Sequence, residues 1–410
     1  MQTSKFKQHI QRLNFDRLDE ITQNFIEEKA DNYRLSFQDI KLLIEIAIDL
    51  KMWQEGSLID IWQDKRDRKT TINEIKKSYN LLKNQPKSYQ NFTSSRENKR
   101  YKLVEVEREK LGFGRCPVAS PKTRCCNLLT LDAVESCGFD CSYCSIQSFY
   151  NENRVGFDKN FKERLHSLRL DPDKTYHIGT GQSSDSLMWG NREGILEALF
   201  EFATKHPNVI LELKSKSDNI KYLLENEIPK NIIVTWSLNP QTIIDNEEHL
   251  TASLADRIKS AKMVADKGAL VGFHFHPIVV YKHYLQEYNA IIQTLIKNFN
   301  PNQVALVSMG TLTFIKPVIK KLREREFNTK ILQMPLNDAS GKLSYPLDIK
   351  REMFKSLYNS FKAWHNKVYF YLCMEDNSLW QEVFGFEYED NNEMERKMIE
   401  AYRQKIKGLI

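Results

Sequence analysis

Short apolar segments alternate with amphipathic helical segments from about residue 126 onwards. The apolar segments have the length of strands, and turn-forming or polar residues bound them. They lie at 128–133, 175–179, 208–213, 232–238, 269–275, 303–308 and 368–372. Helical periodicity recurs between most of them, at 193–204, 219–225, 254–266, 285–297 and 314–325. Because such an order needs right-handed crossovers, it predicts a parallel sheet covered by helices.

About six such repeats predict an α/β fold, a partial (β/α)6 TIM-like barrel with an N-terminal helical extension. Residues 1 to about 85 have helical periodicity, with an N-cap expected at Ser36. A polar stretch at 84–100 predicts a linker. We therefore expect a helical N-terminal domain with a basic linker at 1–100, the barrel at 101–390 and a C-terminal helix at 391–410.

Three cysteines follow the first predicted strand with the spacing C-x3-C-x2-C, at Cys137, Cys141 and Cys144. Three thiolates are one fewer than a structural zinc or a closed iron–sulfur cluster needs. A [4Fe–4S] cluster held by three thiolates keeps one iron open for a small molecule. The alternative is a zinc site completed by a histidine or by one of the other nearby cysteines, which are Cys116, Cys125 and Cys126. The position after a strand and the lack of a second C-x2-C pair favour the cluster.

Polar residues follow nearly every predicted strand, at the end where barrels of this type hold their chemistry. Glycines there allow close backbone approach, and Lys216 could pair with a carboxylate. The candidate cofactor-binding residues are Gly179, Thr180, Gly181, Ser184, Asp185, Lys216, Ser237, Asn239 and His276. His274 and His276 share a strand face and could bind a metal, but without a third ligand nearby we favour a place in the pocket wall.

The net charge of +6 is unevenly distributed. Residues 64–124 contain 17 Lys/Arg and 7 Asp/Glu, a local charge of +10, so the rest of the chain carries about −4. Aromatic residues are interleaved with this basic stretch, which would suit a surface that contacts phosphates and stacks on bases. They are Tyr79, Tyr89, Phe92, Tyr101 and Phe113. A solvated basic helix and linker is the alternative, and it stays open.

The sequence has no apolar run long enough to span a bilayer and no apolar signal-peptide core at its N-terminus. Its 7 cysteines are an odd number, clustered mostly between 116 and 144, which favours a metal site in a reducing compartment over a disulfide framework. We therefore expect a cytoplasmic protein without a membrane partner.

The cysteine spacing, with Tyr143 just before the last cysteine, resembles the cluster loop of the radical S-adenosylmethionine (radical SAM) enzymes. The order of the later segments narrows this to a resemblance, over roughly residues 115 to 390, to spore photoproduct lyase and its relatives, which repair a thymine dimer in DNA. These segments are Ser183–Asp185, Ser215–Lys216, Thr235–Asn239 and Gly268–Ile278. The resemblance implies two cofactors, a [4Fe–4S] cluster and S-adenosyl-L-methionine. It also implies an electron donor such as flavodoxin or ferredoxin, whose electron cleaves S-adenosyl-L-methionine to a 5′-deoxyadenosyl radical.

The resemblance also implies residue roles. Ser184, Lys216 and Ser237 would contact the cofactor, and Tyr143 would lie near the path of the radical. Lys342 and Tyr345, in a late glycine-containing turn, would meet the nucleic acid, for which DNA is favoured over RNA.

Two positions depart from the family pattern. Gln182 stands where the lyase has the cysteine that returns a hydrogen atom, and Ser145 stands where it has a tyrosine. We expect another cysteine to replace the donor, with Cys373 favoured because it ends a predicted strand; a buried free cysteine is otherwise a small apolar residue. These departures indicate a relative of the lyase rather than the lyase itself.

Three functions follow as hypotheses. The first is a radical enzyme that acts on a base in DNA. The second keeps the radical chemistry but acts on RNA, a peptide or a small metabolite. The third is a zinc-stabilised nucleic-acid-binding protein without catalysis.

Overall fold

An eight-stranded sheet forms the centre of the computed structural model, which describes residues 10, 13–97, 101–116, 122–150, 153–339 and 341–409. Seven of its strands are parallel and follow the chain order, and β2 (Gly112–Arg115) pairs antiparallel with the first of them. The parallel strands are β3 (Leu129–Asp132), β7 (Tyr176–Thr180), β8 (Val209–Ser215), β9 (Ile232–Ser237), β11 (Leu270–Ile278), β12 (Val304–Thr311) and β16 (Tyr369–Leu372). All seven predicted strands are therefore confirmed.

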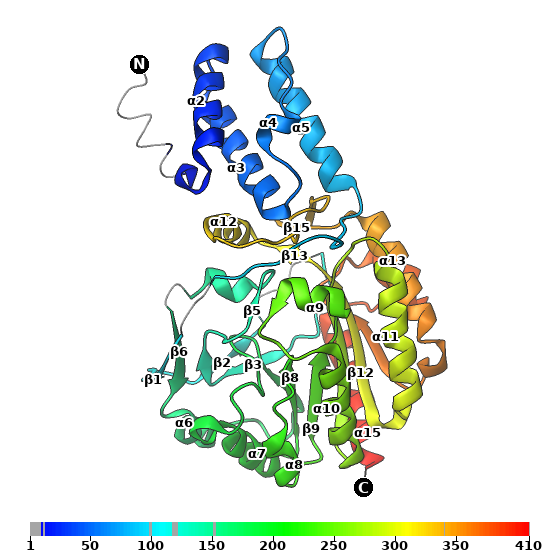
Figure 1. The fold of residues 1–410 in the computed structure, drawn as a ribbon. Coiled ribbons are helices and arrows are strands. Elements are labelled where there is room, and N and C mark those ends of the chain that lie inside the picture. The colour runs from blue at the N-terminus through cyan, green and yellow to red at the C-terminus, as the bar shows by residue number, and fades with distance from the viewer. Residues whose placement is uncertain are drawn as a thin grey trace.

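Helices cover the outer face of this sheet, as Figure 1 shows. They include α6 (Phe161–Ser167), α7 (Ile195–Lys205), α8 (Lys221–Glu225), α10 (Leu254–Asp266), α11 (Tyr284–Asn298) and α13 (Leu347–Ser360). Helix α10 begins and ends at the predicted residues, 254 and 266. The Ser253 side chain caps its first turn and so fixes its start. No pairing between β2 and β16 closes the sheet within the described residues, so the partial barrel is confirmed.

The open side of the barrel is covered by residues 122–127, here called the seam segment. An antiparallel bridge joins Thr123 to Asp376, just after β16. The side-chain oxygen of Asn391 accepts a 3.0 Å hydrogen bond from the backbone N–H of Cys125, and Asn391 begins α15 (Asn391–Lys407). The seam segment therefore connects the first and last strands of the barrel without forming a ladder.

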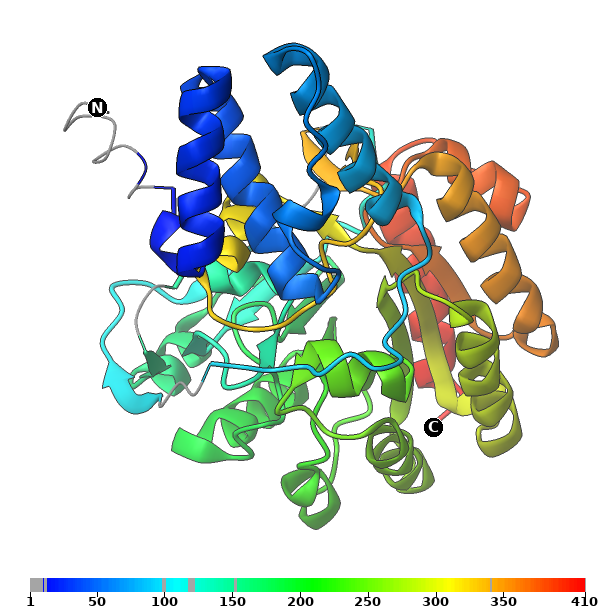
Figure 2. The same ribbon diagram turned by 45° about the horizontal axis from the view of Figure 1, so that its top comes forward.

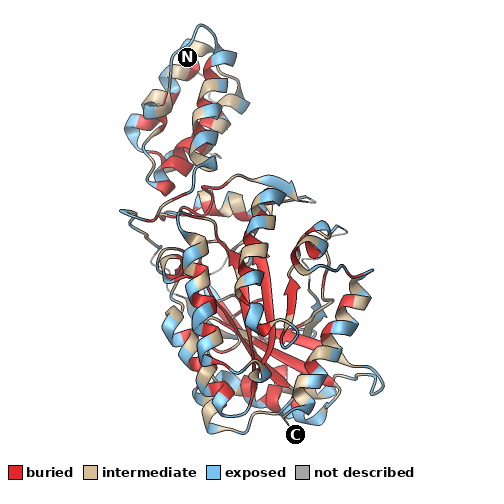
Figure 3. Cartoon of the chain, turned by 90° about the vertical axis from the view of Figure 1, so that its right-hand side faces the viewer, coloured by how far each residue is buried: buried red, intermediate tan, exposed pale blue. Residues whose placement is uncertain are grey.

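Burial follows this layered arrangement, with buried strands inside and half-exposed helices outside (Figure 3). Every residue of β9 and of β12 is buried. Strands covered on both faces are continuously apolar rather than alternating, and these two strands follow that rule except for a few hydroxyls. The core of the protein therefore lies between the sheet and its helices.

The N-terminal region is helical, as predicted. It contains α2 (Glu20–Tyr33), α3 (Phe37–Trp53), α4 (Leu58–Ile61) and α5 (Arg68–Asn84), and it projects from the barrel beside α12 (Lys316–Glu324) (Figures 1 and 2). Ser36 and Asp39 form a capping box at the start of α3. Trp53 and Tyr79 stack with ring centroids 5.4 Å apart in the small core of this region.

A buried ion pair joins the helical region to the barrel. The guanidinium of Arg323, in α12, donates hydrogen bonds of 2.9 and 2.8 Å to the carboxylate of Asp49, which is fully buried in α3. The hydroxyl of Tyr79 donates to the same carboxylate. This arrangement fixes α3 on α12.

Replacing Arg323 by methionine is expected to loosen this junction. Asp49 would stay buried without its cation, and an unpaired buried charge costs about 3–5 kcal/mol. Hydrogen exchange measured by mass spectrometry should show that α3 loses protection while β9 and β11 keep theirs. Lys320→Met, on the exposed face of the same helix, is the control. Unchanged protection in α3 would contradict this account.

Residues 85–97, here called the strap, connect the helical region to the barrel. The predicted linker at 84–100 is polar, yet Lys87 and Tyr89 are buried, and the Lys87 ammonium donates to the carbonyl oxygen of Lys330 at 3.2 Å. Residues 98–100 lie outside the described ranges. The burial of Tyr79 and Tyr89, each 9% exposed, contradicts the prediction that they stack on bases.

Several short strands were not predicted. A second sheet contains β1 (Lys102–Val106), β6 (Arg154–Asp158) and β4 (Val134–Glu135), and a third contains β13 (Thr313–Phe314), β15 (Lys342–Ser344) and β14 (Asn337–Ala339). A two-stranded pair joins β5 (Asp140–Cys141) to β10 (Glu248–His249). Over the described ranges, no helix combines the length and the apolar character needed to cross a membrane.

Candidate active site

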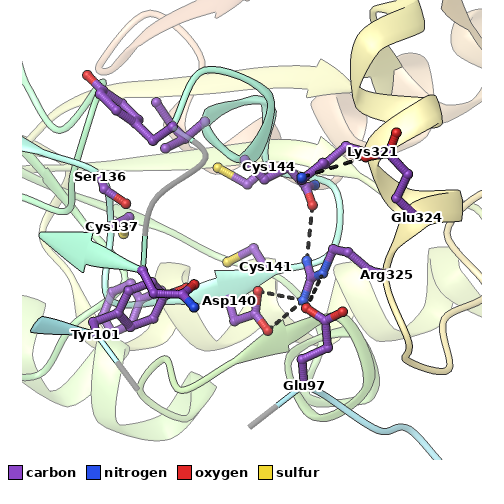
Figure 4. A pocket seen from close by; sticks show the side chains of 15 residues that line it. Glu97, Tyr101, Ser136, Cys137, Asp140, Cys141, Cys144, Lys321, Glu324 and Arg325 are labelled. Atoms are coloured by element: carbon purple, nitrogen blue, oxygen red, sulfur yellow. Dashed lines mark hydrogen bonds and ion pairs between the residues drawn. The ribbon is translucent and has the colours of Figure 1, made fainter. Parts of the chain in front are cut away.

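Cys137, Cys141 and Cys144 lie together at the mouth of the barrel, where the chain leaves β3. All three line two neighbouring cavities, and none forms a disulfide. The outer cavity, shown in Figure 4, also contains Asp140 and Arg325. The inner cavity is lined by the three cysteines and by the ends of β7, β8 and β9. The three predicted metal ligands are therefore brought to one place.

The side chains of the cysteine loop have the chemistry of a metal site, because thiolates are the ligands that soft metal centres prefer. Within the described residues, no three His, Cys, Asp or Glu side chains are close enough together to hold a single metal ion in this structure. Burial raises the pKa of Cys137 to about 12 and also raises the pKa of Cys141 and Cys144. Three ionised thiols here would need a positive centre between them, and a metal cluster supplies one.

The fully buried Glu247 anchors the loop that carries these cysteines, at the end of α9 (Gln241–Glu247). Its carboxylate accepts hydrogen bonds from the hydroxyls of Ser142 and Thr329, from the N–H of Lys330 at 3.0 Å and from the hydroxyl of Tyr89 at 2.8 Å. Its carbonyl oxygen accepts from the N–H of Ser142 at 2.8 Å. The cysteine loop, the strap and the segment after α12 therefore meet at one carboxylate.

Arg325 holds the same loop from the other side (Figure 4). Its guanidinium donates two 2.8 Å hydrogen bonds to Asp140, one of 3.0 Å to the side chain of Gln147 and one of 3.3 Å to Glu97 in the strap. Arg325 is buried, and Arg323, two residues earlier in the chain, contacts α3. Two arginines at the end of α12 thus connect the helical region to the cysteine loop.

Tyr143 is held within the protein. Its hydroxyl donates to the buried carboxylate of Glu248, which also pairs with Arg257 at 2.6 Å and accepts from the side chain of Asn239 at 2.7 Å. Burial would raise the pKa of Glu248, but Arg257 and Lys216 hold it at about 2. Because the backbone of Glu248 also pairs with that of Cys141 across β5 and β10, this residue holds the tyrosine through its carboxylate and the cysteine through its backbone.

Replacing Glu247 by alanine is expected to loosen the cysteine loop. Four donors would lose their acceptor, and each buried unsatisfied donor costs about 1–3 kcal/mol. Iron release from the anaerobically reconstituted protein to a chelator should become at least about tenfold faster. Glu225→Ala, at the exposed end of α8, is the control. If the two variants release iron at the same rate, Glu247 does not position the loop.

Five of the nine predicted cofactor-binding residues line the inner cavity beside the cysteines. They are Gly181, Ser184, Asp185, Lys216 and Ser237. The Lys216 ammonium lies 5.7 Å from the centroid of the Tyr143 ring and has no hydrogen bond or ion pair to any described residue. Nearby acidic groups, Glu248 first among them, outweigh the effect of burial and raise its pKa. Lys216 is therefore a charged group available to an anionic ligand.

Asp185 lines the same cavity, but its carboxylate is occupied. It accepts hydrogen bonds from the hydroxyl of Ser215 at 2.8 Å and from the N–H groups of Lys216, Leu187 and Met188 at 2.6, 2.9 and 3.0 Å. This residue ties the turn after β7 to the end of β8. Its observed role is to position Lys216.

The other four predicted cofactor residues lie outside the inner cavity. The side chain of Asn239 donates to Glu248 and accepts from the hydroxyl of Tyr288 at 2.5 Å, so both its ends are occupied. Gly179, Thr180 and His276 line a third cavity, here called the thiol cavity, inside the barrel. The sequence could not separate these positions, because a strand end alone does not say toward which cavity a side chain points.

The thiol cavity contains all four cysteines that lie outside the cluster loop. They are Cys116, Cys125, Cys126 and Cys373. Gln182 and Lys214 line both this cavity and the inner cavity, so the two spaces adjoin. Gln182, which replaces the cysteine of the family pattern, therefore stands between the cluster loop and the four thiols. Ser145 is exposed at the start of a short 3-10 helix, Ser145–Ser148.

His274 belongs to a buried polar network in the barrel. Its Nε2 lies 2.7 Å from Glu212, which also lies 3.0 Å from the Nε2 of His177, and its Nδ1 lies 2.5 Å from the hydroxyl of Ser308. Burial lowers the pKa of His274 to about 4. Both of its ring nitrogens have protein partners, so His274 does not form a metal site with His276.

The two predicted nucleic-acid contacts differ in exposure. Tyr345 is 2% exposed, and its hydroxyl accepts a 2.9 Å hydrogen bond from the N–H of Val280, which gives it a packing role. Lys342 is half-buried in β15, near Cys116, Cys125 and Cys373. Contact of either residue with nucleic acid stays a prediction.

The residues that hold the cysteine loop were missed by sequence reasoning. Glu247, Glu248 and Arg257 are about a hundred residues away from the cysteines, and Tyr89 and Arg325 are in other segments. Two adjacent glutamates in a polar stretch resemble an exposed helix end. The length of the polar strap is the one sequence signal that could have suggested that it packs against the barrel.

Comparisons with known proteins show a family and a shared fold. The sequence model of the spore photoproduct lyase family matches residues 59–345, more than half of the chain, and begins well before residue 115. A spore photoproduct lyase from Clostridium acetobutylicum is 25% identical over 291 residues, which are 66% of this chain and 82% of that protein.

Solved structures of spore photoproduct lyase share the fold. The lyase complexed with dinucleoside spore photoproduct has a TM-score of 0.56 at 17% identity and matches 66% of this chain and 82% of its own. A double mutant with bound AdoMet and dinucleoside spore photoproduct has a TM-score of 0.55 at the same identity and coverage. On the strength of the family match, this chain belongs to the spore photoproduct lyase family.

Proposed function

We propose that the protein is a radical SAM enzyme that acts on a nucleic-acid base. The observation that carries this proposal is the inner cavity, where three loop cysteines and the unpaired ammonium of Lys216 line one space. Cys137, Cys141 and Cys144 would hold a [4Fe–4S] cluster, and S-adenosyl-L-methionine would occupy the cavity beside it. When bound and reduced by one electron, these cofactors supply a 5′-deoxyadenosyl radical.

The residues of the inner cavity would bind and orient the cofactor. Lys216 would pair with its carboxylate, and the carboxylate of Asp185 keeps the Lys216 backbone in place through the 2.6 Å hydrogen bond. Ser184 and Ser237 add hydroxyls to the same wall. The half-buried ring of Tyr143, beside Lys216, would limit access of water to the reacting groups.

A nucleic-acid substrate is supported by the family and by the charge distribution. A solved relative is complexed with a dinucleoside photoproduct. Some cations of the basic stretch 64–124 are not available to a nucleic acid. Lys87 is buried. Arg108 pairs with Glu135, and Arg124 pairs with Glu387. Exposed cations remain on α5, where Lys69 lies about two turns before the adjacent pair Lys76 and Lys77, on the same exposed side of the helix. We propose this face as a phosphate contact.

For the hydrogen atom that returns to the product we propose Cys373. It lines the thiol cavity next to Gln182 and Lys214, which also line the inner cavity. Burial raises its pKa to about 12, so the S–H bond that a hydrogen donor needs is intact at neutral pH.

The test is release of 5′-deoxyadenosine by anaerobically reconstituted and reduced protein, with and without ultraviolet-irradiated DNA. We expect release in both samples and new nucleoside products only with irradiated DNA. Release without any change in the DNA would favour RNA, a peptide or a small metabolite as substrate. A colourless protein that contains zinc and releases no deoxyadenosine would overturn the proposal.

Binding to duplex DNA should weaken steeply with salt. Each phosphate contact contributes about −0.9 to the slope of log K against log salt concentration. Replacing Lys69, Lys76 and Lys77 together by alanine should reduce the slope by about 2 to 3. The control replaces Lys221, Lys230 and Lys262, exposed or partly exposed residues of the barrel surface. A slope that stays the same in the α5 variant would exclude this face.

A further inference from the structure

Four thiols from three separate chain segments gather in the thiol cavity. Cys116 follows β2, Cys125 and Cys126 belong to the seam segment, and Cys373 follows β16. None of them forms a disulfide. The bridge between Thr123 and Asp376 is antiparallel, so residues after Thr123 run beside residues before Asp376. The seam therefore brings the adjacent pair Cys125 and Cys126 to the end of β16.

Two of these thiols differ in protonation. The thiol of Cys126 hydrogen-bonds to the sulfur of Cys125, and this contact, with help from Lys342, lowers the pKa of Cys125. Burial instead raises the pKa of Cys373 to about 12. The cavity thus combines a thiol that keeps its hydrogen with a thiol that ionises more readily, and the thiolate is the form that makes S–S bonds.

We propose that Cys373 and Cys125 act as a dithiol pair that is oxidised to a disulfide in each turnover. This inference rests on the proposed function and adds a second substrate class, an external dithiol reductant. The pair would replace the hydrogen-return step that the family pattern assigns to the position of Gln182.

The steps balance. The hydrogen atom of the Cys373 S–H bond goes to the substrate-derived radical, and a sulfur radical stays on Cys373. The Cys125 thiolate bonds to that sulfur, and the surplus electron returns to the oxidised one-electron carrier that began the turnover. An external dithiol then reduces the disulfide; it is itself oxidised to a disulfide, restores the Cys373 thiol and the Cys125 thiolate, and releases one proton.

The proposal predicts how turnover depends on thiols. Without an external dithiol, each protein molecule should make about one product, because the pair is then a disulfide. Anaerobic alkylation followed by peptide mass spectrometry should show Cys373 linked to Cys125, or to Cys126 after exchange within the pair. If all four thiols are alkylated as free cysteines after turnover, the proposal is wrong. If no deoxyadenosine forms at all, the proposed function fails instead.

A second readout does not depend on activity. Protein in which Cys137, Cys141 and Cys144 are alanine keeps the four cavity thiols and cannot hold the cluster. Treatment with oxidised dithiothreitol should convert two of those thiols into one intramolecular disulfide that includes Cys373. Cys125→Ser in the same background should reduce the yield of that disulfide at least about tenfold, since the thiolate is the attacking form. Equal yields in the two proteins would overturn the assignment of Cys125.

Discussion

Replacing Cys141 by alanine is expected to abolish both the brown colour of the reconstituted protein and the release of 5′-deoxyadenosine. Cys141 is buried, lines both cavities of the cluster loop and pairs with Glu248 across β5 and β10. With two thiolates left, the cluster loses one of its three protein ligands. Iron content and deoxyadenosine yield are the two measurements, and both should fall to background.

The matched control for this variant is Cys116→Ala. Cys116 is also a cysteine without a disulfide, but it lines the thiol cavity and not the cavities of the cluster loop. It should keep the iron content of the unchanged protein. Deoxyadenosine release that persists in Cys141→Ala would refute the radical function, for DNA and for every other substrate.

Replacing Lys216 by methionine is expected to weaken binding of S-adenosyl-L-methionine by about 10- to 150-fold. Methionine keeps most of the volume of the lysine stem but removes the ammonium, and a hydrogen bond to a charged group contributes about 1.5–3 kcal/mol. The iron content should stay unchanged, because Lys216 holds no part of the cysteine loop through a hydrogen bond. Equilibrium dialysis with the labelled cofactor measures the dissociation constant directly.

Lys221→Met is the control for this prediction. Its side chain is 79% exposed on α8, only five residues further along the chain. It should bind the cofactor as the unchanged protein does. If Lys216→Met also binds normally, the ammonium faces another group, and the inner cavity takes a ligand without a carboxylate at that position.

The order of the barrel strands could be predicted from the sequence. Most of the strands are short, buried apolar runs, and the predicted amphipathic helices follow β7, β8, β9 and β11. The helix predicted at 314–325 is α12, which packs on α3, and α13, which covers the sheet before β16, was not predicted. The cluster loop could also be predicted, because its three cysteines lie within eight residues of one another. Lys216 was found for a similar reason: it follows a buried strand directly.

The surroundings of these residues depend on contacts between distant parts of the chain. Three residues at or near the ends of strands have different surroundings. Ser237 lines the inner cavity, His276 lines the thiol cavity, and the side chain of Asn239 bonds to Glu248. The strap has a polar sequence, yet Tyr89 is buried, because its hydroxyl reaches the carboxylate of Glu247. The four outer cysteines are up to 257 residues apart in the chain. Their meeting depends on the packing of the seam segment across the open side of the barrel, a long-range contact that no local pattern encodes.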